Sequence, residues 1–103
     1  MIAHPSCVVM TAQLARWADE HPERLAWIIE CLGRHNARDW GDLDQMDAAL
    51  NDNSVVRRAG RVLSRYVVPT ALLDGADDDA IWIITDDRAD VESMTTILWP
   101  SDY

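Results

Sequence analysis

The sequence predicts an α+β domain in which N-terminal helices pack on one face of an antiparallel sheet. Two observations predict this class. Apolar residues recur at helical spacing in the first half of the chain, and alternating apolar runs, typical of strands, fill the second half. Helices and strands segregated in this way favour a two-layer arrangement. A chain of 103 residues is long enough for one hydrophobic core, so we expect a single domain over residues 1–103.

Two helices are expected early in the chain. After the apolar tract 7–10, which can form a short strand, Thr11 suits the N-cap of a short helix over 12–19. A second helix over 22–32 starts with a proline, and Gly33 follows it at the place of a left-handed cap. Its inner face is predicted from an i, i+3, i+4, i+7 stripe that consists of Leu25, Ile28, Ile29 and Leu32.

A third helix is expected to start near Leu43 and to end around residues 51–53. Asp42 and Gln45 stand three positions apart, as the two polar residues of a capping box do. Residues three or four apart share one face of a helix. The expected inner face therefore holds Leu43, Met46 and Leu50, and the expected outer face holds Asp44 and Asp47.

Three strands are predicted in the second half of the chain, over residues 61–68, 80–86 and 94–99. Turn-forming residues in 69–79 and 87–93 predict antiparallel connections between them. Residues 80–86 are apolar on both faces, so this strand should lie inside the sheet. The expected sheet is an antiparallel meander of three strands, or of four.

The charge balance narrows the class of partner. The chain has 18 acidic residues against 9 basic ones, all of them arginine, and its formal net charge is −9. A field of this sign repels a polyanion, so we expect no direct contact with nucleic acid. It favours a partner protein with a basic surface, or it serves solubility alone.

Membrane, metal and cofactor sites are not expected. No run approaches the ~20 apolar residues that span a bilayer, and the N-terminus lacks the pattern of a signal peptide. We therefore expect a cytoplasmic protein with no membrane partner. Cys7 and Cys31 form neither a Cys-x-x-Cys pair nor a zinc-site spacing, so reduced thiols are expected, and no metal or cofactor.

The densest polar stretch of the chain carries two interpretations. Carboxylate oxygens are the ligands that Mg²⁺ prefers, but the spacing lacks both the Asp-x-Asp-x-Asp-Gly run and the final Glu of an EF-hand loop. A capped helix with a solvated acidic face explains the pattern better, and such a face can serve as a docking surface. The stretch contains Asp39, Asp42, Asp44, Asp47, Asn51 and Asp52.

Trp40 and His35 each leave an alternative open. Trp40, in a polar turn, is either a partly exposed interface anchor or a lid over the core. His35 with Arg38 and Asp39 has the groups that acid–base chemistry needs. The other interpretation is a polar helix end, where Arg and His interact with the terminal carbonyls.

Three arginines of the strand region are a further candidate site. They either converge at one end of the sheet to hold a phosphate or a carboxylate, or they neutralise aspartates nearby. In a chain with a net charge of −9 the second interpretation is favoured. These residues are Arg61, Arg65 and Arg88.

Four stretches of the chain carry a family resemblance. They are Arg34-His35 with Asp39-Trp40-Gly41-Asp42-Leu43-Asp44, then 60–66, then 81–86 with Arg88, and finally 95–103. In order and rough spacing they resemble a family of small bacterial proteins found on plasmids and integrated conjugative elements, the plasmid-related proteins. The match runs from about His4 to the end of the chain. The resemblance implies a fold and a genetic context, and it carries no activity over.

Two functions are therefore expected as alternatives. The first is a small acidic accessory protein that binds a basic protein surface, and in the genetic context that the resemblance implies it would modulate host or mobile-element machinery. The second is a small metal-dependent or acid–base hydrolase that uses His35 and the Asp39–Asp47 cluster. Convergence of those side chains in a pocket would favour the enzyme. The binding residues expected for the first function are Trp40, Asp42, Asp44, Asp47, Arg61 and Arg88.

Overall fold

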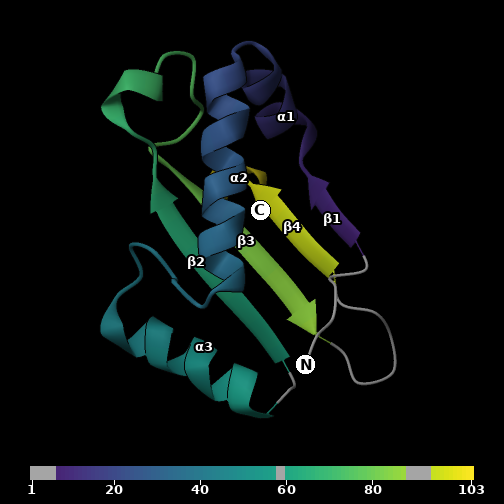
Figure 1. The fold of residues 1–103 in the computed structure, drawn as a ribbon, viewed down its shortest axis with the longest axis vertical. Helices are drawn as coiled ribbons and strands as arrows, with labels where there is room; N and C mark the ends of the chain where they lie inside the picture. The colour runs from purple at the N-terminus through teal and green to yellow at the C-terminus, as the bar shows by residue number, and fades with distance from the viewer. Residues whose placement is uncertain (1–6, 58–59, 88–93) are drawn as a thin grey trace.

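A computed structural model describes residues 7–57, 60–87 and 94–103 of the chain. Within these residues the fold is α+β, with three helices and a four-stranded sheet (Figure 1). Two single-turn 3₁₀ helices complete it, η1 and η2. In chain order the elements are β1 (Cys7–Met10), α1 (Ala12–Asp19), α2 (Pro22–Asn36), α3 (Gln45–Arg57), β2 (Gly60–Val67), η1 (Thr70–Leu72), β3 (Ala80–Asp87), β4 (Met94–Leu98) and η2 (Pro100–Asp102).

The sheet is mixed, with the strand order β1-β4-β3-β2. Strands β2, β3 and β4 form the expected antiparallel meander. The prediction of a purely antiparallel sheet is wrong, because β1 pairs parallel to β4, from Cys7 opposite Met94 to Met10 opposite Ile97. No hairpin turn joins β1 to its neighbour, so packing of the helices that follow, rather than a local turn, sets its direction.

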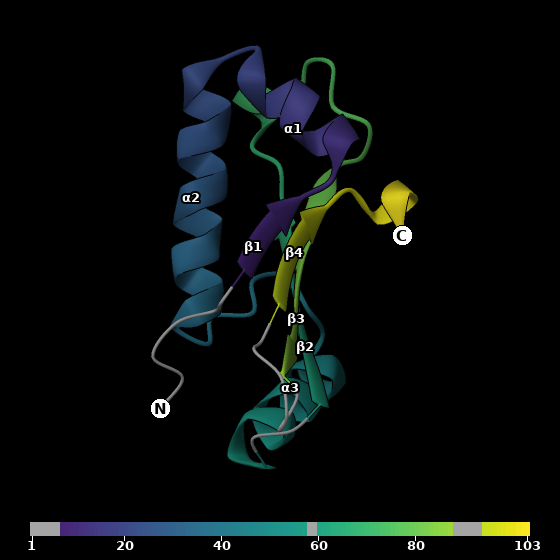
Figure 2. The same cartoon turned by 90° about the vertical axis from the view of Figure 1, so that its right-hand side faces the viewer.

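The core lies between the sheet and the helices α1 and α2, which cover the same face (Figure 2). Trp17 of α1 packs edge-on against Trp99 at the end of β4, with 5.1 Å between ring centroids. Trp27 flanks Trp17 at 6.5 Å. The buried cluster consists of Leu14, Trp17, Ala18, Ile28, Cys31, Tyr66, Val68, Ile81, Ile83, Ile97 and Trp99. Burial raises the pKa of Cys31 to about 12, so this thiol stays protonated at neutral pH.

Helix α2 is longer than predicted and turns another face inward. It continues through Gly33 to Asn36 and ends in a Schellman turn, with Arg38 left-handed at φ 66° and the Asp39 N–H bound to the Arg34 carbonyl at 2.8 Å. Gly33 is therefore not the cap. The expected stripe is wrong in part, because Leu25 and Ile29 are exposed. The buried face of α2 consists of Arg24, Ile28, Cys31 and His35.

Arg24 is buried because its guanidinium finds carbonyl acceptors inside the fold. Its Nη1 donates to the Trp17 carbonyl at 2.9 Å, and its Nη2 donates to the Asp74 carbonyl at 2.7 Å. The guanidinium also lies 4.7 Å from the centroid of the Trp17 ring. These contacts tie α2 to the loop before β3, and they compensate the burial of a charge.

Helix α3 packs against the edge strand β2 at one end of the molecule (Figure 1). It starts at Gln45, and Asp44 caps it by accepting the Asp47 N–H at 2.8 Å. Asp42 was the expected cap, but its carboxylate binds the Val67 N–H instead. The prediction that Met46 and Leu50 lie on the inner face of this helix is wrong, because both side chains face solvent. Among residues 7–57, 60–87 and 94–103, no helix is long and apolar enough to cross a membrane.

Candidate functional site

The segment before α3 forms a short extension of the sheet along the outer edge of β2. The N–H of Arg65 donates to the Trp40 carbonyl at 3.1 Å, and the Asp42 N–H donates to the Arg65 carbonyl at 2.6 Å. Gly41, between these contacts, has φ 72°, and a Cβ there would lie 2.1 Å from the Arg65 carbonyl oxygen. Only glycine fits this approach.

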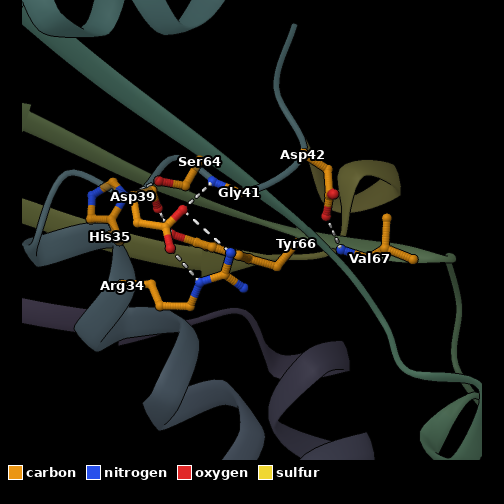
Figure 3. A network of polar contacts seen from close by, with 8 residues as sticks. All are labelled: Arg34, His35, Asp39, Gly41, Asp42, Ser64, Tyr66 and Val67. Carbon is orange, nitrogen blue, oxygen red and sulfur yellow. Dashed lines mark hydrogen bonds and ion pairs between the residues drawn. The ribbon is translucent and has the colours of Figure 1, made fainter.

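Two polar side chains pair with further backbone groups of this edge. The carboxylate of Asp42 accepts the Val67 N–H at 3.0 Å (Figure 3). The amide of Asn51, on the inner face of α3, accepts the Leu63 N–H at 3.1 Å and donates to the Leu63 carbonyl at 2.5 Å. The outward groups of Leu63 and Arg65 and the N–H of Val67 are therefore paired, and at these groups the edge is sealed against another strand.

Trp40 is a lid and not an exposed anchor. Its side chain is 7% exposed, and its ring meets the His35 ring edge-on at 5.6 Å between centroids. The indole Nε1 donates to the Asp52 carboxylate at 2.9 Å. Trp40 and Asp52 therefore hold the segment and α3 together, and the second of the two sequence interpretations is the observed one.

Arg34 and Asp39 close the turn that follows α2 (Figure 3). The guanidinium donates to the carboxylate through Nε at 2.7 Å and Nη2 at 3.3 Å. The hydrogen bond from Arg34 lowers the pKa of the Asp39 carboxyl, and the Gly41 N–H adds to this effect. The Asp39 carbonyl accepts the Tyr66 hydroxyl at 2.7 Å, while burial raises the pKa of Tyr66 to about 12.

His35 points into the molecule and meets strand hydroxyls. Its Nδ1 is hydrogen-bonded to Ser64 Oγ, and its Nε2 to Thr85 Oγ1 at 2.8 Å. Thr85 Oγ1 in turn is 2.8 Å from Thr95 Oγ1. Burial lowers the pKa of His35 to about 4, so the imidazole is neutral at physiological pH. Ser64 and Thr95 are fully buried, so the arrangement offers a substrate no access to these hydroxyls.

The sequence identified His35 but missed its hydroxyl partners. Ser64, Thr85 and Thr95 each lie two residues from a buried residue on the same face of their strand, Tyr66, Ile83 and Ile97 respectively, and this alternation was the available signal. A polar residue in such a position needs a partner. The pattern does not say which residue supplies it.

The side chains that the hydrolase alternative requires do not converge. His35 binds strand hydroxyls inside, Asp39 pairs with Arg34 at the surface, and Asp42 binds the Val67 N–H. Asp44 caps α3. In the part of the chain that the structure describes, no three His, Cys, Asp or Glu side chains are grouped to hold a metal ion.

The arginines that were expected to converge have separate contacts where the structure describes them. The Arg61 guanidinium lies 5.0 Å from the centroid of the Tyr103 ring. The Nη2 atom of Arg65 lies 3.8 Å from the Asp79 carboxylate. Arg88 lies outside the described residues, so the three-arginine site stays a prediction.

The solvent-facing side of α3 combines exposed apolar and acidic side chains. Met46 is 76% exposed and Leu50, one turn later, 60%. The carboxylates of Asp44, Asp47 and Asp52 are exposed around them. Those of Asp44 and Asp52 accept only uncharged donors, and no ion pair among the described residues involves any of the three. We call Met46, Leu50, Asp44 and Asp47 the α3 outer face.

Comparisons of the chain with protein-family models, curated proteins and solved structures give no match. The geometry of the chain itself is therefore the basis for assigning a function. It gives a helix anchored to a sealed sheet edge, with an apolar and acidic face directed to solvent.

Proposed function

We propose that the protein acts as a binding module for a basic protein, and that the α3 outer face is the contact surface. The observation that carries the proposal is the exposure of Met46 and Leu50 on a helix next to carboxylates that form no ion pair with any cationic side chain that the structure describes. This assigns the expected acidic docking surface to Asp44 and Asp47. Trp40 and Asp42 serve as supports that hold the surface in place.

The energetics of the α3 outer face favour a contact. Burying a side chain such as Met or Leu stabilises a complex by roughly 1.5–3 kcal/mol before other costs are counted. Met46 and Leu50 do not contribute this free energy of burial to the stability of the unbound protein, because both side chains are exposed. Aspartates around an apolar centre match the usual arrangement of an interface, with polar residues at its rim. They also steer a basic partner toward the surface.

The way α3 is anchored supports a preorganised surface. Asn51 binds both backbone groups of Leu63, and Asp52 binds Trp40, so two successive residues fix the inner side of the helix. A rigid contact surface loses less conformational freedom on binding than a mobile one. The outer face can therefore bind without rearrangement of α3.

The resemblance to the plasmid-related proteins would place the partner among host or mobile-element machinery in the cytoplasm. The formal charge of −9 argues for a basic protein rather than a nucleic acid. A protein that itself binds nucleic acid has the required surface, because its phosphate-binding site is basic. The acidic face would then occupy such a site in place of phosphates.

Site-specific photo-crosslinking tests the proposal. A benzophenone amino acid is placed at Met46, and for comparison at Leu73, which is exposed on the loop after η1. We expect one basic protein to be crosslinked from position 46 but not from position 73. The additional change Asp44→Asn/Asp47→Asn should weaken the product, because it removes two charges while leaving Met46 in place. Equal products from both positions, or none from position 46, would contradict the proposal.

A further inference from the structure

The two edges of the sheet differ in how their backbone groups are covered. At the β2 edge, the outward groups of Leu63 and Arg65 are paired by Asn51 and by the segment before α3. The opposite edge is β1, which lies at the end of the strand order beside β4. Figure 2 faces this edge, and none of the described elements lies in front of the strand. An edge strand of this kind can pair with another strand.

The parallel register with β4 determines which backbone groups of β1 point outward. The Thr11 N–H donates to the Ile97 carbonyl at 3.0 Å, so Thr11 and Val9 direct their backbone groups toward β4. Because these groups alternate in direction along a strand, the N–H and C=O of Val8 and Met10 point away from the sheet. No backbone hydrogen bond between described residues uses them. Their pattern of donors and acceptors fits an extended strand.

The side chains at this edge form an apolar and uncharged surface. Val8 is 43% exposed and Val9 39%. Met10 packs against the core, so Val8 lies on the face that carries α1 and α2, and Val9 lies on the opposite face. Strands β1 and β4 contain no charged residue, in a chain whose net charge is −9. Natural edge strands are commonly blocked by lysine, proline or a bulge, and β1 has none of these.

We propose that a second copy of the chain adds to β1 as an antiparallel strand, about a two-fold axis at Val9. This register sets Val8 of each copy opposite Met10 of the other, so that every outward N–H meets an outward C=O. The two Val9 residues face each other in a non-hydrogen-bonded pair, where side chains approach most closely. The contact is self-complementary, as a two-fold interface must be, and it joins the two sheets into one.

The uncharged surface favours a second copy over a strand from the basic protein proposed to bind α3. A basic strand would place its charges against apolar side chains of β1 and β4, and no carboxylate in either strand would attract it. In the self-pair, β-branched Val9 packs against Val9. No like charges of these two strands come together, so the net charge of −9 acts only at longer range.

Sedimentation equilibrium tests whether the dimer forms. A short strand pair is a small interface, so we expect a monomer–dimer equilibrium at concentrations up to about 1 mM. Val9→Lys sets two like charges opposite each other and should weaken dimerisation at least about tenfold. Val67→Lys is the matched control, because Val67 is an exposed valine on the same face of the sheet at the β2 edge. It makes the same change in net charge and should dimerise like the unmodified chain.

Val8→Pro tests the backbone pairing itself. It removes an outward N–H from each copy and leaves the hydrogen bonds between β1 and β4 in place, so the monomer should stay folded. Val8→Thr keeps both the N–H and the branched side chain. We expect Val8→Pro to lose the dimer and Val8→Thr to retain it. Equal dimerisation of the two variants would overturn the inference.

Amide hydrogen exchange gives a readout that is specific to strand pairing. The Val8 and Met10 amides should exchange rapidly in dilute solution and slowly at about 1 mM, while the Thr11 amide is protected at both concentrations. A chain that stays monomeric at the highest concentration overturns the inference. So does a dimer in which the Val8 and Met10 amides still exchange rapidly. Protection of both amides at every concentration would mean that the same molecule covers the edge, which also overturns it.

The inference and the proposed function of α3 can fail separately. Met46→Ser/Leu50→Ser changes only the α3 outer face, so this variant should dimerise like the unmodified chain. Val9→Lys in turn should leave crosslinking from position 46 unchanged, because β1 and α3 lie at opposite edges of the sheet (Figure 1).

Discussion

The side-chain amide of Asn51 forms two hydrogen bonds with Leu63, one to the backbone N–H and one to the carbonyl. An amide in this position replaces a neighbouring strand at the edge of the sheet, and it fixes α3 to β2 through the same two bonds. The residue that blocks the sheet edge therefore also sets which side of α3 faces solvent. Met46 and Leu50 are exposed because Asn51 and not an apolar residue is buried.

Asn51→Ala should destabilise the protein by about 2–3 kcal/mol, because it leaves both Leu63 groups without the partner they have in the fold. Urea unfolding measures the change in the free energy of unfolding. Gln13→Ala, which removes an exposed amide from α1, is the matched control and should change stability by less than about 0.5 kcal/mol. Equal stability of the two variants would mean that the amide does not anchor α3.

Gly41→Ala should destabilise the fold by more than about 3 kcal/mol for two reasons. The alanine Cβ would overlap the Arg65 carbonyl oxygen, and the alanine backbone would have to adopt a positive φ. Gly75→Ala isolates the second effect. Gly75 has φ 75°, but its nearest neighbour, the Trp17 ring, is 3.9 Å away, so this variant should lose only about 1 kcal/mol. Thermal unfolding of both variants compares the two losses, and a smaller loss at position 41 than at position 75 would contradict the sealed edge.

His35 predicts a specific dependence of stability on pH. Its pKa falls from the ordinary 6.5 to about 4 in the folded state, so the unfolded chain binds more protons between these values. Stability should therefore be full above pH 6.5, fall as the pH is lowered from 6.5 to 4, and lose at most about 3 kcal/mol through this residue. Urea unfolding of His35→Gln should show a smaller loss in this window. His21→Gln, at an exposed position, should behave like the unmodified chain.

An NMR titration of the His35 ring checks the same claim without a substitution. Its carbon-bound proton shifts should stay constant from neutral pH down to about pH 5. Titration of His35 near its ordinary pKa of 6.5 would show that the ring is not held among the hydroxyls.

Trp40→Phe tests whether Trp40 stabilises the fold or contacts the partner protein. It removes the hydrogen bond to Asp52 but keeps an aromatic lid over His35, so it should cost about 1 kcal/mol of stability. Partner binding should be unchanged, because Trp40 is buried behind α3 and not on its outer face. If the variant lost affinity for the partner while its stability stayed unchanged, Trp40 would have to be part of the contact surface.

Local sequence signals recovered the elements better than their faces. The first helix and the strand that begins at Ala80 were predicted almost to their ends, because helical spacing and strand alternation of apolar residues are local signals. The Thr11 side chain makes no capping hydrogen bond to α1 and donates to Asp102 instead. The inward face of α2 was not, since Arg24 and His35 are buried by partners such as Asp74 and Ser64 far away in the sequence. The parallel pairing of β1 escaped prediction for the same reason, because no turn beside it fixes its direction.

The sequence singled out the polar stretch from Asp39 to Asp52, but it did not give the contact that each residue makes. The stretch from Asp39 to Asp52 does hold the polar residues that organise this end of the molecule. Its members looked alike in the sequence, yet Asp42 and Asn51 bind the sheet edge while Asp44 caps α3. Only the register of this segment against β2 divides them into supports and exposed charges.

The most direct test of the α3 outer face is the dissociation constant of the crosslinked partner, purified and titrated calorimetrically with the unmodified chain and with Met46→Ser/Leu50→Ser. We predict that the double change weakens binding by a factor of about 100, since two apolar contacts are lost while the helix stays folded. Leu73→Ser should bind like the unmodified chain. An unchanged dissociation constant for the double variant would contradict the account.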